Sequence, residues 1–183
     1  MTVRGVDVNA SDWDCTIEGE QGGRGWCPSA GALEAGPAVR LGMRLVRGMS
    51  EDVATRVVMA RASGPYVSVD DVARRARVSE GDVARMARAD MFGGLSLRRR
   101  EALWDALVDR DVKPLWEGQE DVVTRDMVCL PEMSDDEEVV ADYRAQGLSL
   151  RGHPFAGIRE RVQRLGAKLA SDLVGEAHGT RLA

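Results

Sequence analysis

The sequence of 183 residues carries 25 basic and 30 acidic side chains, for a formal net charge of −5, and 44% of its residues are hydrophobic. This length suits one domain with appendages, and an aromatic content of only 4% favours a small, largely helical core of Val, Leu and Ala. No apolar run approaches the roughly 20 residues that span a bilayer, and the N-terminus lacks the apolar stretch of a signal peptide. We therefore expect no membrane partner and a cytoplasmic location.

Cysteine and histidine are too sparse to indicate a disulfide framework or a metal centre. The cysteines Cys15, Cys27 and Cys129 show no C-x-x-C spacing, and the histidines His153 and His178 lie far from them in the sequence. Zinc sites usually place such residues in closely spaced pairs. We predict incidental, reduced thiols, no metal site and no cofactor in this chain.

The charge is unevenly distributed, which bears on nucleic-acid binding. Residues 40–113 hold 15 basic and 11 acidic side chains, whereas residues 114–143 hold 1 and 10. The acidic side chains are thus concentrated in one connecting segment, residues 114–143. Almost every cation is an arginine, with Lys113 and Lys168 the only lysines. Arginine suits bidentate contact with phosphate, although a genome rich in G and C would give the same bias without a functional cause.

The composition of residues 1–39 is typical of the end of a larger region. VRGVDVN is extended in character, SDWDCTIE alternates weakly, and GEQGGRGWCPSAGALEAGP is rich in glycine and proline. This pattern favours two short strands joined by a loop, in a β-hairpin-like arrangement. Because an isolated pair of strands is marginally stable in water, we expect this remnant to have packed against further chain.

The stretch LGMRLVRGMSEDVATRVVMAR matches the helix-hairpin-helix pattern. We expect a first helix over residues 38–45, a turn, and a second helix with apolar residues at three- and four-residue spacing. Gly48 permits the positive φ of a tight turn, and Ser50 caps the second helix. The amides of Gly48, Met49 and Ser50 would face outward at a helix N-terminus, where a phosphate oxygen can bind. With Arg47, these residues are the main candidate contacts to a DNA backbone.

A second hairpin follows at an offset of 29 residues, in the sequence RVSEGDVARM. Gly48 aligns with Arg77 and Ser50 with Ser79, which begins a capping-box pattern. Two hairpins bury apolar faces that one alone would leave exposed, so the duplication predicts a tandem helix-hairpin-helix domain over residues 40–112. Arginine in place of glycine weakens the second turn as a phosphate site. We interpret Arg77 and Ser79 as mainly structural, with a side-chain phosphate contact as the alternative.

The helix expected over residues 96–109, capped by Ser96, carries the run Arg98, Arg99 and Arg100. Such a run is usually a solvated helix face. Its position beside two hairpins makes these arginines auxiliary candidates for phosphate contact.

The rest of the chain divides into an acidic linker and a helical segment. Residues 113–133 are acidic, contain two prolines and lack periodicity, which is typical of a linker. Ser134 and Glu137 form a capping-box pattern that begins a helix. A further helix is expected to begin near Pro154. We interpret His153 as a turn or capping residue, because no carboxylate or nucleophile is spaced to work with it.

Together these features resemble the C-terminal part of the bacterial error-prone DNA polymerase of the C family, a relative of the replicative polymerase III α subunit associated with damage tolerance. The likeness rests, in chain order, on VDVNASDWDCTIE, AVRLGMRLVRGM, GPYVSVDD, RRREALW and EEVVADYRAQGLSLRGHPF. The first stretch resembles the end of the fingers region, the second the entry to a tandem helix-hairpin-helix domain, and the last the segment ahead of an OB-fold.

The resemblance implies a mainly α fold with a fingers remnant in residues 1–39 and a DNA-binding domain in residues 40–112. It implies a linker in residues 113–133 and, in residues 134–183, a helical segment that leads to an OB-fold outside this sequence. In this family, acidic residues of the palm hold two metal ions for nucleotidyl transfer. The palm, the PHP domain and most of the fingers are also expected outside this sequence, with no catalytic residue inside it. The chain would then belong to a Mg²⁺-dependent DNA polymerase without polymerising by itself.

Three functional hypotheses follow from the sequence. In the first, the chain binds double-stranded DNA without sequence preference, as part of an error-prone polymerase in translesion synthesis and DNA repair. In the second, it is a protein-interaction scaffold within a lesion-bypass assembly, with other polymerase subunits and the sliding clamp as partners. In the third, it is a truncated remnant without an independent role.

Overall fold

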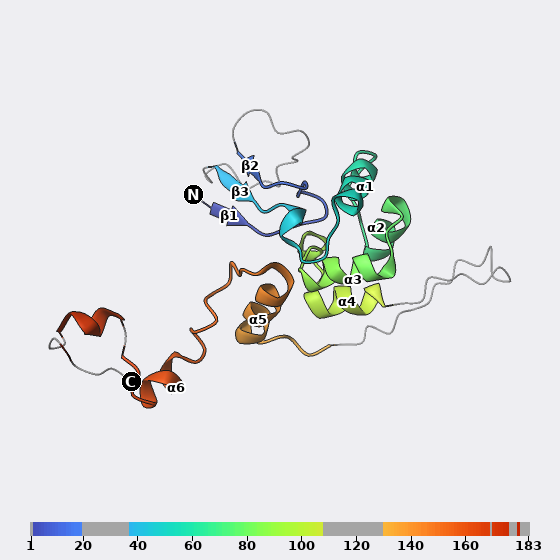
Figure 1. Cartoon of the computed structure of the whole chain (residues 1–183). Helices are drawn as coiled ribbons and strands as arrows, with labels where there is room; N and C mark the ends of the chain where they lie inside the picture. Colours follow the sequence, from blue (N-terminus) through green and yellow to red (C-terminus); the bar gives the residue numbers. More distant parts are fainter. Residues whose placement is uncertain (1, 20–36, 108–129, 169, 176–178, 180–183) are drawn as a thin grey trace.

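The computed structural model describes residues 2–19, 37–107, 130–168, 170–175 and 179, and it is mainly helical with a small sheet at its N-terminal end (Figure 1). The described helices are α1 (Glu51–Arg61), α2 (Val69–Ala76), α3 (Glu80–Arg88), α4 (Arg99–Ala106), α5 (Asp135–Gln146) and α6 (Arg159–Arg164). The strands are β1 (Thr2–Arg4), β2 (Thr16–Glu18) and β3 (Ala38–Arg40). The described 3₁₀ helices are η1 (Met43–Leu45), η2 (Gly93–Leu95) and η4 (Ala170–Gly175). The predicted fold class is confirmed.

The sheet has the order β1-β3-β2, with β1 parallel and β2 antiparallel to β3. The Glu18 carboxylate on β2 pairs with Arg4 at 2.9 Å and with Arg40 at 2.8 Å, so ion pairs connect all three strands. The sequence pattern predicted the start of a helix at residues 38–40, and this prediction was wrong. A three-residue segment is too short to reveal that both neighbouring strands will draw it into a ladder.

The first hairpin begins with the single turn η1 instead of the α-helix expected over residues 38–45. Met43 N–H donates to the Asp12 carbonyl at 2.8 Å, and Arg44 N–H donates to the Trp13 carbonyl at 3.1 Å. Gly42 lies so close to this segment that a Cβ would approach the Trp13 carbonyl oxygen to 2.4 Å. Because the N-terminal segment accepts these backbone hydrogen bonds, the helix is limited to one turn.

The described part of residues 1–39 packs into the same core as the helices. Val6 and Val8 are buried with the helical side chains. Asn9 exchanges two hydrogen bonds with the backbone of Tyr66, at 3.0 and 2.7 Å, and the buried Ser11 hydroxyl donates to the Leu41 carbonyl at 2.7 Å. Assignment of this segment to a separate fingers region stays a prediction, and its physical contacts are with the hairpins.

The two hairpins form one helical unit. Helix α1 packs on α2, α2 packs on both α3 and α4, and α3 packs on α4 and α5. The most buried side chains of this unit, none more than 1% exposed, include Val57, Val72, Val83, Met86, Met91 and Phe92. Each large apolar side chain buried in this way stabilises the fold by about 1.5–3 kcal/mol.

Serine caps begin most of these helices, and the caps predicted at Ser50, Ser79 and Ser134 are confirmed. The hydroxyls of Ser50, Ser68, Ser79 and Ser134 each accept a hydrogen bond from the backbone N–H three residues later. The cap predicted at Ser96 was wrong: Ser96 ends η2 in the left-handed conformation, with φ of 58°. Helix α4 begins one residue after Arg98, because the Glu101 carboxylate accepts from the Arg98 N–H at 2.9 Å.

The C-terminal helix is shorter than predicted. It begins at Arg159 instead of near Pro154, and Phe155 and Leu165 are 60% and 77% exposed. Without a packed partner, apolar periodicity does not extend a helix. His153 has the predicted turn role, because its Nδ1 accepts from the Phe155 N–H at 3.2 Å. The predicted acidic linker lies outside the described residues as far as residue 129.

A buried ion pair fixes the connection between α1 and α2. The Asp71 carboxylate pairs with Arg75 at 2.9 Å and accepts from the Val67 N–H at 3.3 Å. Arg75 also donates to the carbonyls of Ala60 and Gly64, both at 2.6 Å, and lies over the Tyr66 ring. Burial opposes ionisation of Asp71, but the hydrogen bonds from the neighbouring arginines and from Val67 outweigh it and lower the pKa of this carboxyl group.

We expect Asp71→Asn to lower the free energy of unfolding at pH 7 by about 1–3 kcal/mol, because it leaves the half-buried Arg75 without its carboxylate. The folded pKa of Asp71 is depressed, so its contribution is complete above the unfolded pKa of about 3.9 and is lost as the pH falls toward the folded value. Urea unfolding between pH 7 and pH 3 should therefore find a difference between variant and wild type that shrinks below about pH 4.

The matched control is Glu51→Gln, which neutralises an exposed first-turn carboxylate of α1. Its effect should be much smaller. A difference for Asp71→Asn that stays constant down to pH 3 would contradict the assignment.

Candidate nucleic-acid interface

The turn of the first hairpin has the left-handed geometry that its glycine predicts. Gly48 has φ of 77° and is exposed between η1 and α1. Met49 faces inward, with a side chain only 8% exposed. The Met49 N–H donates to the Val46 carbonyl at 3.1 Å, and the Arg47 N–H donates to the Ala145 carbonyl of α5 at 2.8 Å.

Along residues 47–50, amides that donate to carbonyls of the protein therefore alternate with amides that do not. Among the described residues, no acceptor meets the N–H of Gly48 or of Ser50. The Ser50 hydroxyl accepts from the Val53 N–H at 3.3 Å, and α1 begins at the next residue. The sequence predicted three outward amides in a row, and the structure leaves two, because Met49 closes the turn. Two open amides at a helix N-terminus are a suitable environment for an oxyanion.

Two arginines flank this turn, one next to Gly48 in the sequence and one from the second hairpin. Arg47 is exposed beside α5, where its Nη2 would be 3.5 Å from a Cβ at Gly147. Arg85 comes from the second hairpin, and its Nε would be 3.3 Å from a Cβ at Gly48. Sequence reasoning missed Arg85, because only the packing of one hairpin on the other brings α3 to the first turn. Arg85 also pairs with Asp82 of its own helix.

The second turn has the same backbone geometry without the same open amides. Arg77 occupies the position of Gly48 and adopts φ of 49° and ψ of 49°. The N–H groups of Arg77 and Val78 both donate to the Ala73 carbonyl. Arg56 of α1 donates to the Arg77 carbonyl, so a cation rather than an anion approaches this backbone. Among the described residues, the Ser79 amide is the one amide of this turn without an acceptor, and the mainly structural role of Arg77 and Ser79 stays a prediction.

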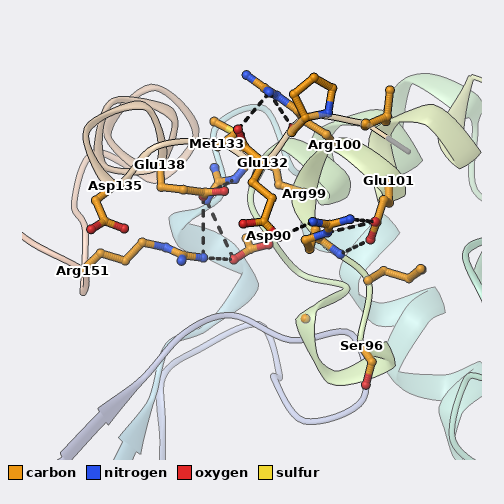
Figure 2. Close-up of a pocket in the computed structure, with 15 residues that line it drawn as sticks. Asp90, Ser96, Arg99, Arg100, Glu101, Glu132, Met133, Asp135, Glu138 and Arg151 are labelled. Carbon is orange, nitrogen blue, oxygen red and sulfur yellow. Dashed lines mark hydrogen bonds and ion pairs between the residues drawn. The ribbon is translucent and has the colours of Figure 1, made fainter. Parts of the chain in front are cut away.

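The three consecutive arginines have different environments, and Figure 2 labels two of them, Arg99 and Arg100. The Arg99 side chain is 5% exposed, pairs with Asp142 and with Glu138 at 3.1 Å, and donates to the Arg88 carbonyl at 2.6 Å. It lies inside the protein and is not available to a phosphate, so the auxiliary contact predicted for Arg99 is incompatible with the structure. Arg98 and Arg100 are partly exposed and are paired with carboxylates.

The described residues show neither a metal site nor a membrane-crossing helix. No group of three or more His, Cys, Asp or Glu side chains in these segments is placed to hold a metal ion. None of the helices in the described part combines the length and the hydropathy that a bilayer crossing requires. The open amides and nearby arginines at the first turn remain the distinctive chemistry.

The fold and the turn geometry define a helix-hairpin-helix protein. A family profile described as "Helix-hairpin-helix motif" matches residues 1–102, which is more than half of the sequence, and the chain belongs to this family. The match includes the N-terminal segment that shares the helical core.

The relatives of this chain are error-prone DNA polymerases. The chain is 38% identical to the "Error-prone DNA polymerase" of Methylococcus capsulatus over 94% of its length, and 38% identical to that of Burkholderia mallei over 87%. It is 39% identical to the "Error-prone DNA polymerase 2" of Rhizobium meliloti over 87% of its length. These matches cover 17%, 13% and 14% of the respective relatives, so the chain corresponds to a part of them. The resemblance inferred from the sequence is confirmed.

We predict different effects on stability at the two equivalent turn positions, when a side chain is added at Gly48 and when the side chain is removed at Arg77. Gly48→Ala should cost about 1–2 kcal/mol, since a side chain at φ of 77° is crowded by its own backbone and would also meet Arg85. Arg77→Gly should be neutral or stabilise by up to about 1 kcal/mol, since it relieves the same crowding at the cost of a more flexible unfolded chain. Urea unfolding of both variants measures the effects, and an equal loss in both would contradict this explanation.

Proposed function

We propose that this chain binds double-stranded DNA through its phosphates, without reading base sequence, as one part of an error-prone DNA polymerase that takes part in translesion synthesis. The observation that carries the proposal is the first turn. Two amides without an acceptor, at Gly48 and Ser50, precede an 11-residue helix and are accompanied by Arg47 and Arg85.

The chemistry of these groups favours backbone contact over base reading. An amide N–H donates to any phosphate oxygen, and contacts of this kind position a protein on DNA without sequence information. The exposed carboxylates of Glu51 and Asp52 stand in the first turn of α1 and disfavour a deep approach of other anions. A single phosphate held by Gly48 and Ser50 from the side of Arg47 meets this constraint best.

The second hairpin supports the first and adds a lesser contact. Its turn has one open amide, at Ser79, and the exposed Arg77 side chain beside it. We assign Arg77 a side-chain contact with a neighbouring phosphate and Ser79 mainly a capping role. Arg98 and Arg100 are auxiliary cations, and Arg99 is excluded by its burial.

Catalysis is assigned to other parts of the parent polymerase. Several carboxylates of the described residues are used in helix caps and ion pairs, as in Glu137 at Ser134 and Asp71 at Arg75. We expect no nucleotide incorporation by this chain alone and a cytoplasmic location for the parent protein, with Mg²⁺ bound by its palm.

A protein-interaction role is the second candidate, and one observation favours it. The segment after α5 leaves apolar side chains in solvent, with Phe155 60%, Ile158 43% and Leu165 77% exposed. Exposed apolar residues that lie close together in the sequence are typical of a contact surface. Another polymerase subunit or the sliding clamp would be the partner, and this role is compatible with DNA binding at the first turn.

We predict that Arg47→Gln weakens binding to a duplex of random sequence about threefold to tenfold at low salt, and reduces the slope of log K against log salt by about 0.9. Fluorescence anisotropy across a salt series measures both quantities. Arg164→Gln is the matched control, since it removes the same charge from the exposed helix α6. Equal losses in the two variants, or an affinity independent of salt, would argue against the proposal.

The amide itself is tested by a pair of variants at one position. Ser50→Ala and Ser50→Pro both remove the capping hydroxyl, but only proline also removes the open N–H. Once thermal melting establishes that both variants are folded, Ser50→Pro should bind DNA several-fold more weakly than Ser50→Ala. Equal affinities would exclude the Ser50 amide as a phosphate donor.

A further inference from the structure

Arg98 and Arg100, at the start of α4, are covered by an acidic segment of the same chain. We call residues 130–137, with the sequence LPEMSDDE, the acidic strap. Arg98 Nη1 lies 2.6 Å from the Glu132 carboxylate, and Arg100 Nη2 lies 3.4 Å from the Glu137 carboxylate. Arg100 also donates to the Pro131 carbonyl at 2.7 Å. Arg98 and Arg100, which were predicted as auxiliary phosphate contacts, are thus already in contact with carboxylates and carbonyls.

The strap and the helix together form a cleft of about 460 Å³, shown in Figure 2. The lining includes Arg98, at the N-cap of α4, with Arg100 and Glu101 of α4, and Pro131 and Glu132 of the strap. The Arg98 and Arg100 side chains are 48% and 36% exposed at this cleft, and Glu132 is 80% exposed. These ion pairs are accessible to water and to dissolved ions, and pairs of this kind are weak.

The strap includes the first residues of α5, Asp135 to Glu137, but among the described residues its carboxylates take no part in the ion pairs that hold α5 on Arg99. Helix α5 is anchored by Glu138 and Asp142, which pair with the buried Arg99. Gln146 adds a hydrogen bond to the Ala89 carbonyl at 2.8 Å. The carboxylates of Glu132 and Glu137 can therefore leave their arginines while this anchor stays closed. Residues 130–142 then contain two attachments. The one at Glu138 and Asp142 stays closed, and the one at Glu132 and Glu137 can be replaced.

We propose that the acidic strap is an autoinhibitory contact, in which Glu132 and Glu137 occupy Arg98 and Arg100 in place of DNA phosphates. The inference rests on the proposed DNA binding and goes beyond it. A duplex held at the first turn raises the local concentration of phosphate at α4, and phosphates then compete with the strap for both arginines. A planar carboxylate and a tetrahedral phosphate each offer two oxygen acceptors at a spacing that suits a guanidinium group, so the exchange keeps the arginine hydrogen bonds. The strap lowers affinity for DNA, most of all at low salt.

The test compares full-length chains in anisotropy titrations with a DNA duplex. Glu132→Gln/Glu137→Gln removes the two strap charges, and glutamine at position 137 can still accept the Ser134 N–H of the helix cap. Asp135→Asn/Asp136→Asn is the matched control, since it removes two charges from the same segment that form no ion pair with Arg98 or Arg100 in the described structure. The first variant should bind about threefold to tenfold more tightly than wild type at low salt, and clearly more tightly than the control.

A second arm asks whether the gain passes through the two arginines. Arg98→Gln/Arg100→Gln should cost less affinity in the wild-type chain, where the strap competes with DNA for these side chains, than in the Glu132→Gln/Glu137→Gln chain, where it should also abolish the gain. Non-additivity of this kind identifies groups that share one interaction. Thermal melting establishes that each variant is folded before its affinity is interpreted.

The possible failures are distinguishable. If wild type binds DNA in an Arg47-dependent manner but the strap variant and the control gain equally, the strap is overturned and the DNA-binding function stands. If the arginine substitutions cost the same in both backgrounds, the strap is likewise overturned. If no variant binds DNA, the proposed function and the strap both fail. Binding by the strap variant where wild type shows none would support both.

Discussion

The buried guanidinium group of Arg99 is the interaction on which the arrangement of this protein depends. A cation that is 5% exposed is costly to bury unless carboxylates surround it, and Asp90, Glu138 and Asp142 do so from the end of α3 and from α5. Arg151 joins the same carboxylates from the far side. Burial would lower the pKa of Arg151, but the nearby acids outweigh it and raise the pKa, so the group stays charged. Helix α5 is thereby fixed on the hairpins, and it is this helix that accepts the Arg47 N–H at the Ala145 carbonyl.

This fixed position of α5 explains which amides of the first turn face solvent. The Arg47 and Met49 amides are used inside the protein, by α5 and by the turn itself, so the Gly48 and Ser50 amides between and after them have to point the other way. The second turn has no equivalent of α5 above it. Its amides return to α2, and Arg56 covers its carbonyls instead. Two turns of one pattern therefore differ through their neighbours: among the described residues the first has two open amides, at Gly48 and Ser50, and the second has one, at Ser79.

Local signals in the sequence were sufficient for the hairpins but not for what surrounds them. Ser50, Ser79 and Ser134 act within three residues of their partners, so a sequence pattern could identify these caps. The alignment of Arg77 with Gly48 located the second turn, and the structure shows its left-handed backbone. Strand β3 and the shortened η1 could not be predicted, since their hydrogen bonds come from residues about 30 positions away, as in Met43 with Asp12. The same limit applies to Arg99, which looks like one cation of a solvated run until Asp142, 43 residues later, is placed beside it.

The basic surplus of the hairpin region does not translate into a basic surface, and this favours amides as the specific element of the site. Arg61 donates to the carbonyls of Val8 and Ser11, Arg75 donates to those of Ala60 and Gly64, and Arg99 lies among carboxylates. Such arginines hold the fold together and contribute little to the field that a DNA duplex experiences. What remains at the first turn is a small number of exposed cations, themselves close to acids such as Asp82. Because the directional donors there belong to the backbone, the proposed contact would accept any phosphate of suitable geometry and would not depend on base sequence.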